Sequence, residues 1–145
     1  MPRAPLAIAI TLALALGGTA IAQQTVSNPT VLKRIAAMST MQDAVKRLGR
    51  IAKGKSAYDA TAVKADLATI QAQAARIPAL YKADIRDPNS EARSKIWSNL
   101  PDFNTRAQAV ERASTAALQG TPATFVQDFN TIGAACSACH KAYRK

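Results

Sequence analysis

The residues best suited to chemistry lie together near the end of the chain. Cys136 and Cys139 are the only cysteines and His140 is the only histidine, so every thiol and imidazole falls within the five residues CSACH. Thiolate sulfur and imidazole nitrogen bind transition metals, and thiols also form disulfides and other covalent links. The spacing Cys-x-x-Cys-His favours some of these chemistries over others.

Three possible interpretations fit the window poorly. A disulfide between Cys136 and Cys139 is possible in an oxidising compartment, but it would close a loop of only a few residues and constrain the unfolded chain little. A thioredoxin-like redox pair is expected at the start of a helix near a βαβ unit, whereas this pair lies toward the end of a predicted helix. A zinc site takes four Cys, His or carboxylate ligands, and the window supplies three.

The fourth interpretation is covalent attachment of haem c, for which Cys-x-x-Cys-His is the signature. Each thiol adds to one of two vinyl groups on adjacent pyrroles, and cysteines three positions apart on one helical turn reach both groups. His140, the next residue, is then placed to ligate the iron. We expect one haem c per chain, held by two thioethers from Cys136 and Cys139.

The first 22 residues, MPRAPLAIAITLALALGGTAIA, predict a secretory signal peptide. An arginine precedes an apolar run of about eleven residues, a Gly-Gly pair ends the run, and Ala-Ile-Ala forms a cleavage pattern before Gln23. The run is too short to remain as an uncleaved anchor, because a membrane-spanning helix takes about 20 apolar residues. We therefore expect a mature single domain, residues 23–145, in the periplasm of a bacterium and without an integral membrane segment.

The composition is strongly basic. The whole chain has 19 Lys and Arg against 9 Asp and Glu, a formal net charge of +10, and loss of Arg3 with the signal peptide leaves +9. Export argues against nucleic acid as the partner of this surface. An acidic redox partner protein or an anionic membrane surface fits the charge better, and a merely soluble, well-charged surface is the alternative. No nucleophile–base pair or acidic dyad is apparent, so the sequence does not predict an enzyme.

Four segments of the mature chain have the apolar period of an amphipathic helix. Asn28 is expected to cap the first helix and Pro78 to stop the second. Residues 79–99 are expected to be irregular, apart from a helical turn near Trp97. Short connections make neighbouring helices antiparallel, so the predicted fold class is all-α, an antiparallel four-helix bundle. The expected helices are about Pro29–Lys53, Thr61–Ile77, Pro101–Gln119, and Thr121 almost to the C-terminus.

The apolar faces of the first and last helices carry the residues of chemical interest. Alanine dominates much of the remaining apolar surface, and alanine faces bury little area. A large apolar group bound between the helices is therefore expected to complete the core. The first face is Val31, Ile35, Met38, Met41, Val45, Leu48 and Ala52, and the last face is Phe125, Phe129, Ile132, Cys136, Cys139 and Tyr143.

With its signal peptide, its four helices and the motif C-x-x-C-H-x-x-Y-R from Cys136 to Arg144, the chain resembles the class II c-type cytochromes, the cytochrome c′ family. The resemblance covers essentially the whole mature chain. AKGKSAYDATAV, residues 52–63, and KIWSN, residues 95–99, look like family segments, although Ala57 stands where relatives often have proline. The resemblance implies a haem buried between the helices, electron transfer or gas binding, and often a homodimer.

The family also suggests a second iron ligand. Low-spin members, the cytochrome c-556 type, have a methionine opposite the histidine, and high-spin members have an apolar residue there. Counting back from the turn at residues 52–63 places Met38 at that position. From the residues alone, Met38 and Met41 are the only methionines of the mature chain, and both lie on the apolar face of the first helix. We expect His140 and Met38 to ligate the iron and Met41 to fill the core.

Three functions follow from these patterns. The preferred one is one-electron transfer by a low-spin His/Met haem protein, because a thioether ligand raises the reduction potential. The alternative is a high-spin cytochrome c′ that binds NO or CO, with Met38 as core. A metal-binding or purely structural bundle without haem is the third.

Two arginines are further candidates for contact with the cofactor. Arg34 lies one turn before Met38 and is placed for charge-assisted hydrogen bonds to a haem propionate; an exposed helix arginine is the alternative. Arg144 lies one turn beyond His140 and is placed to influence the imidazole, as the resemblance also suggests. As a C-terminal cation it would equally complement the helix dipole.

Overall fold

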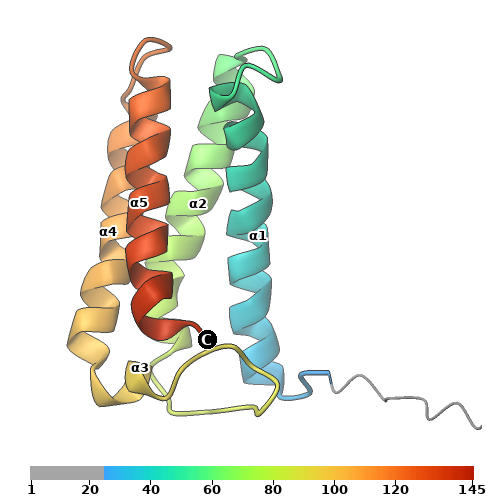
Figure 1. Cartoon of the computed structure of the whole chain (residues 1–145), viewed down its shortest axis with the longest axis vertical. Helices are drawn as coiled ribbons and strands as arrows, with labels where there is room; N and C mark the ends of the chain where they lie inside the picture. Colours follow the sequence, from blue (N-terminus) through green and yellow to red (C-terminus); the bar gives the residue numbers. More distant parts are fainter. Residues whose placement is uncertain (1–24) are drawn as a thin grey trace, which may run out of the picture.

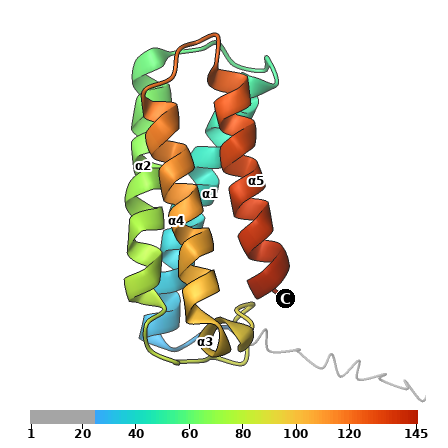
Figure 2. The ribbon, with the colours of Figure 1, turned by 90° about the vertical axis from the view of Figure 1, so that its left-hand side faces the viewer.

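The computed structural model describes residues 25–145, and the predicted signal peptide, residues 1–22, lies outside that part. The described residues form four long helices that pack as an antiparallel bundle and contain no strand (Figures 1 and 2). The prediction of an all-α four-helix bundle is therefore confirmed. The helices are α1 (Pro29–Ala52), α2 (Ala60–Leu80), the short α3 (Lys95–Ser98), α4 (Leu100–Leu118) and α5 (Phe125–Tyr143). None of these helices is long and apolar enough to cross a membrane.

The ends of α1 are set by two residues, Asn28 and Gly54, whose types are typical of helix ends. The Asn28 carboxamide oxygen accepts hydrogen bonds from the backbone N–H groups of Thr30 at 2.9 Å and Val31 at 3.3 Å, as expected of an N-cap. At the other end Gly54 has a φ of 66°, a left-handed conformation that favours glycine and ends the helix. The short helical turn predicted near Trp97 is also present, as α3.

Two predicted boundaries are wrong. Pro78 does not stop α2, which continues to Leu80. Proline removes its own N–H donor and crowds the carbonyl four residues earlier. The backbone N–H of Tyr81 nevertheless donates to the Ile77 carbonyl at 3.1 Å, so the last turn of α2 still closes.

The second wrong boundary is the start of α5, which begins at Phe125 rather than at Thr121. The hydroxyl oxygen of Thr124 accepts a hydrogen bond from the Thr121 backbone N–H at 2.9 Å. Residues 121–124 are thereby held in a separate turn that precedes the helix.

The core lies mainly between three pairs of helices. α1 packs on α2, α2 on α4, and α4 on α5, whereas α1 and α5 make few contacts. The face of α1 that is buried consists of Val31, Arg34, Ala37, Met41, Ala44 and Leu48. The predicted apolar face of α1 was therefore partly wrong: Ile35 is 43% exposed, and Met38 and Val45 are only half-buried.

A long crossover segment, residues 81–94, joins α2 to α3 and closes one end of the bundle (Figure 1). The Asp87 carboxylate accepts hydrogen bonds from the backbone N–H groups of Ser27 at 3.1 Å and Asn28 at 3.2 Å, next to the start of α1. The backbone N–H of Arg93 donates to the Tyr143 carbonyl at 2.9 Å, at the end of α5. The crossover segment thus ties the first turn of α1 to the last turn of α5.

Candidate functional site

The three residues of the Cys-x-x-Cys-His motif lie in the last two turns of α5. Cys136 and Cys139 are half-buried free thiols, and His140 is exposed. Burial raises the pKa of both thiols, that of Cys139 to about 11, so both remain protonated at neutral pH. Redox-active cysteines instead have a lowered pKa. Among residues 25–145, no group of three His, Cys, Asp or Glu side chains lies close enough to hold a metal ion.

One contact fixes the register of α1 against α5. A Cβ atom placed on Gly49 of α1 would lie 3.3 Å from the Cζ atom of Phe129 of α5, so the two helices meet closely there. Residues eleven positions apart lie three turns apart on the same face of a helix, because eleven is close to three times 3.6. On α1, Met38 is eleven residues before Gly49; on α5, His140 is eleven residues after Phe129.

Met38 and His140 therefore lie on the facing sides of antiparallel helices, each about 16 Å from the Gly49–Phe129 contact. The two predicted iron ligands thus share a register that the sequence spacing alone did not define.

The two methionines of the described chain have different surroundings. Met41 is 8% exposed and belongs to the buried core, on the face of α1 that packs against α2. Met38 is half-buried at the edge of that core, as are Cys136 and Cys139. The thioether of Met38 is thus the one that stands at the facing sides of α1 and α5.

Space opens between α1 and α5 beyond their contact. Gly133 lies one turn after Phe129 on the same face of α5, and a Cβ placed on Gly133 would meet nothing within 4 Å. Figure 2 shows α1 and α5 meeting near the turn that follows α1 and diverging toward the end of the bundle that carries α3. A flat apolar group fits this arrangement, because half-buried apolar side chains and a glycine line the diverging faces and the donor set is two thiols, an imidazole and a thioether.

Two residues of α4 hold the backbone around the motif. The Arg106 guanidinium donates to the Asp102 carboxylate at 2.7 Å and to the backbone carbonyl of Ala138 at 3.2 Å. The Tyr143 hydroxyl donates to the same carboxylate at 2.6 Å. Arg106, and then Tyr143, lower the pKa of Asp102, and burial together with Asp102 raises the pKa of Tyr143 to about 12. These contacts with α4 therefore hold the residues on either side of Cys139 and His140 in the chain, Ala138 and Tyr143.

Arg144 lies at the end of α5 in a charged contact. Its guanidinium forms an ion pair with Glu91 of the crossover segment, and its backbone N–H donates to the His140 carbonyl at 2.9 Å. His140 keeps an exposed edge, but the burial of the rest of its ring, followed by the positive charge of Arg144, lowers the pKa of the imidazole. A lowered pKa favours the neutral imidazole, which is the form that binds a metal.

Arg34 is buried rather than exposed, with 2% of its surface accessible. Its guanidinium donates to the backbone carbonyls of Leu80, Ala83 and Ile85 at 2.5–2.8 Å. It also lies over the ring of Tyr81, 4.7 Å from the centroid. Burial lowers the pKa of Arg34. Three of its five N–H donors are thus used to hold the start of the crossover segment.

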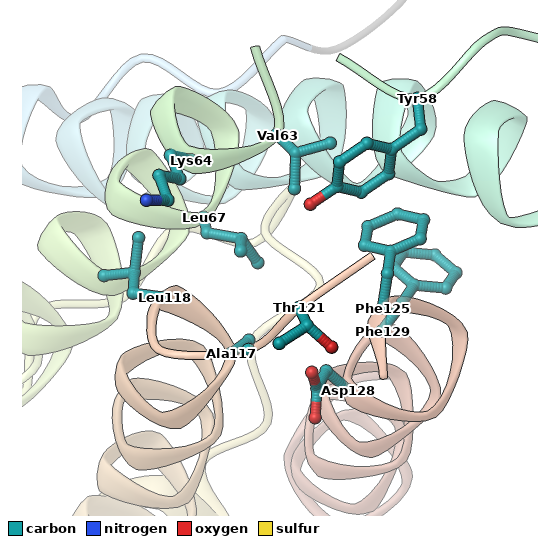
Figure 3. A pocket seen from close by; sticks show the side chains of 11 residues that line it. Tyr58, Val63, Lys64, Leu67, Ala117, Leu118, Thr121, Phe125, Asp128 and Phe129 are labelled. Atoms are coloured by element: carbon teal, nitrogen blue, oxygen red, sulfur yellow. The ribbon is translucent and has the colours of Figure 1, made fainter. Parts of the chain in front are cut away.

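A small cavity at the opposite end of the bundle does not belong to this site. It has a volume of about 10 Å³, enough for about one water molecule. Figure 3 shows it between the turn after α1 and the turn before α5, lined by residues that include Tyr58, Lys64, Phe125 and Asp128. None of the predicted site residues lines it.

Sequence reasoning missed four residues that shape the site. Asp102 and Arg106 carry a detectable signal, an acidic and a basic residue four positions apart on one helix. Gly49 and Gly133 are glycines inside helical patterns, which often mark a close approach of another group. The sequence contained these signals, but it did not show which helix each residue faces.

Comparison with known proteins identifies relatives over nearly the whole described chain. A family model described as Cytochrome C′ matches residues 30–144. Cytochrome c-556 of Agrobacterium tumefaciens (strain apple 185) is 39% identical over 114 residues, which are 77% of this chain and 90% of the relative.

Two solved structures have the same fold. A structural model of oxidized Rhodopseudomonas palustris cytochrome c556 is 27% identical, with a TM-score of 0.74, over 82% of this chain and 98% of that chain. A nitric oxide complex of a cytochrome c prime mutant from Alcaligenes xylosoxidans is 30% identical, with a TM-score of 0.72, over 80% of this chain and 94% of that chain. With these relatives and the site on α5, the chain belongs to the cytochrome c′ family of haem proteins.

Proposed function

We propose that this protein is an exported one-electron carrier with one haem c, bound covalently through Cys136 and Cys139 and ligated by His140 and Met38. The observation that carries the proposal is the shared register of Met38 and His140, each eleven residues from the Gly49–Phe129 contact. When bound, the haem supplies a one-electron couple, and a His/Met ligand pair favours a raised reduction potential.

The residues of the chain bind and orient the group in this proposal. The neutral imidazole of His140 and the thioether of Met38 supply a nitrogen and a sulfur from opposite sides of the space between α1 and α5. Asp102 and Arg106 keep the turn of Cys139 and His140 in place through Tyr143 and the Ala138 carbonyl. Since His140 and Met38 would both hold the iron, we assign no catalytic residue and do not propose an enzymatic activity.

Arg34 and Arg144 take part in the proposal as groups one turn along the helix from Met38 and from His140, respectively. Two N–H donors of Arg34 are not used by the three backbone carbonyls, and Arg34 is one turn from Met38. We assign these donors to a haem propionate, which would form charge-assisted hydrogen bonds with them. We assign Arg144, whose charge already lowers the pKa of His140, to tuning the imidazole.

A high-spin protein that binds NO or CO is the second candidate function. The observation that favours it is the nitric oxide complex among the solved relatives, 30% identical to this chain. In that case Met38 would be an apolar core residue, and His140 alone would hold the iron to which the gas binds.

A visible spectrum of the purified holoprotein separates the candidates. Electron transfer by a His/Met site predicts sharp, split bands in the reduced state, typical of six-coordinate low-spin haem. Broad high-spin bands would support the gas-binding function instead. A protein without a Soret band, made in a host that attaches haem c, would contradict both.

The covalent link has a separate test. Haem should remain with the polypeptide after denaturation and extraction with acidified organic solvent, and Cys136→Ala with Cys139→Ala should release it. Complete extraction of haem from the unmodified protein would contradict the two thioethers.

Export, assembly and partners complete the proposal. We propose cleavage before Gln23 and a periplasmic location, which intact mass and fractionation of the expressing cells would test.

A homodimer is proposed from the family resemblance, and sedimentation velocity of the holoprotein would measure it. The basic composition, with a net charge of +9 after cleavage, supports an acidic redox partner protein.

A further inference from the structure

Six basic residues gather where α5 ends. We call them the cationic patch: Arg93, Lys95, Arg106, Lys141, Arg144 and Lys145. Contacts around Tyr143 join several of them. The Arg93 backbone N–H donates to the Tyr143 carbonyl at 2.9 Å, and the Lys95 ammonium lies 5.8 Å from the centroid of the Tyr143 ring. Figure 1 shows the C-terminus, α3 and the crossover segment together at this end of the bundle.

The remaining members of the cationic patch are joined to the same end of α5. Arg106 donates to the Ala138 carbonyl at 3.2 Å, and the Lys145 backbone N–H donates to the Glu91 carbonyl at 2.8 Å. Lys141 follows His140 directly. All six residues are exposed except Arg106, which is half-buried.

The acidic residues in contact with the cationic patch balance only part of its charge. Asp102 pairs with Arg106 and Glu91 pairs with Arg144. Two carboxylate side chains against six basic side chains leave an excess of four positive side-chain charges. His140, the more exposed of the two proposed iron ligands, directly precedes Lys141, and its carbonyl accepts a hydrogen bond from the Arg144 backbone N–H at 2.9 Å.

We infer that the cationic patch is the docking surface for an acidic redox partner protein. The inference rests on the proposed function and names the surface through which that function is exercised. Opposite charge on the partner would steer it to the end of α5 and raise its association rate. Electron exchange with the partner would then take place at the end of α5 beside His140, which is the most exposed of His140, Met38, Cys136 and Cys139.

A lipid surface fits the cationic patch less well than an acidic protein. A peripheral membrane site combines basic residues with apolar side chains that enter the lipid. In the described chain the exposed large apolar side chains are Leu32, Ile35, Tyr58 and Val126, which belong to α1, the turn after it and the first turn of α5. None belongs to the cationic patch.

The test uses a patch variant and a matched control. The patch variant is Arg93→Gln with Lys141→Gln, and the control is Lys53→Gln with Lys55→Gln, in the turn at the opposite end of the bundle (Figure 1). Each removes two positive charges. Within residues 25–145, none of these four side chains forms a hydrogen bond or an ion pair, so folding should be unaffected.

Reduced holoprotein would be mixed in a stopped-flow instrument with hexacyanoferrate(III), an anion, and with tris(phenanthroline)cobalt(III), a cation. In each reaction one electron leaves the haem iron and reduces the probe. At about 10 mM ionic strength, where charges act over roughly 30 Å, the patch variant should react about tenfold more slowly with the anion. It should react faster with the cation. A change in reduction potential alone would move both rates in the same direction.

The outcomes distinguish the docking surface from net charge and from the proposed function. Opposite rate changes in the patch variant, with much smaller ones in the control, support the docking surface. Equal changes in the two variants would overturn it while leaving electron transfer intact. Patch-dependent sedimentation with phosphatidylglycerol vesicles would assign the surface to lipid and also overturn it. Failure of both probes to oxidise the unmodified protein would reject the proposed function itself.

Discussion

At the scale of single residues, the carboxylate of Asp102 connects the motif on α5 to the rest of the bundle. It accepts hydrogen bonds from Arg106 at 2.7 Å and from Tyr143 at 2.6 Å, and these contacts, with Arg106 first, lower its pKa. A carboxylate with a lowered pKa in the folded state stabilises the fold above its unfolded pKa of about 4. That stabilisation is lost as the pH falls through the folded pKa.

Asp102→Asn should therefore lower the free energy of unfolding at pH 7, and the difference from the unmodified protein should shrink as the pH falls below about 4. Urea unfolding of the holoprotein at several pH values measures this. Asp43→Asn is the matched control, because the Asp43 carboxylate contacts only the exposed Lys46, at 3.4 Å. A difference between Asp102→Asn and the unmodified protein that is independent of pH would contradict the role of the charge.

At the scale of helices, the space beside Gly133 follows from the divergence of α1 and α5. A Cβ on Gly133 meets nothing within 4 Å, although the neighbouring turn of α5 touches α1 through Phe129. If the haem occupies this space, Gly133→Leu should fill it and reduce the haem bound per polypeptide, by several-fold. Ala134→Leu, on the exposed side of the same turn, is the control. The pyridine haemochrome assay gives the ratio of haem to protein, and equal ratios in the two variants would place the haem elsewhere.

Helix number and most helix ends were predictable from the sequence, because they depend on local signals. The apolar period predicted four long helices, and Asn28 acts as the cap that its position indicated. The prediction that Pro78 stops α2 was wrong, because the hydrogen bond from the Tyr81 N–H to the Ile77 carbonyl forms despite the proline. The start of α5 was misread because the Thr124 hydroxyl holds a separate turn.

The directions in which α1 presents its side chains were only partly predictable. A single apolar face was expected, but the helix has a core face that includes Arg34 and Met41 and an adjacent, half-covered face that includes Met38. Periodicity gives the angle of a residue around its own helix but not the neighbour opposite it. Choosing between those faces required the contact between Gly49 and Phe129.

At the scale of the whole molecule, Arg34 holds together parts of the chain that are far apart in sequence. Its three hydrogen bonds, to the carbonyl of Leu80 at the end of α2 and to those of Ala83 and Ile85, fix the crossover segment. This segment in turn contacts the start of α1 through Asp87 and the end of α5 through Arg93. Arg34→Leu would remove the donor to the Leu80 and Ile85 carbonyls, whereas the Ala83 carbonyl would keep its hydrogen bonds from Ile85 and Trp97, and the variant should be destabilised by about 3 kcal/mol.

Hydrogen exchange of the holoprotein would locate the effect of Arg34→Leu. Amides of residues 82–93 should exchange faster in this variant, whereas Lys33→Leu, at an exposed neighbouring position, should leave them unchanged. Equal protection of the crossover segment in both variants would show that Arg34 does not hold it.

The identity of the second iron ligand decides between electron transfer and gas binding, and the visible spectra of two methionine variants test it most directly. Met38→Leu keeps an apolar side chain but removes the thioether at the level of His140, so the reduced protein should change from low-spin to high-spin and bind carbon monoxide faster. Met41→Leu replaces a core residue that is 8% exposed with one of similar volume, and should keep the low-spin spectrum. If Met38→Leu keeps the low-spin spectrum and Met41→Leu loses it, the register of α1 and α5 is contradicted. If the unmodified protein is already high-spin, ligation by Met38 is contradicted.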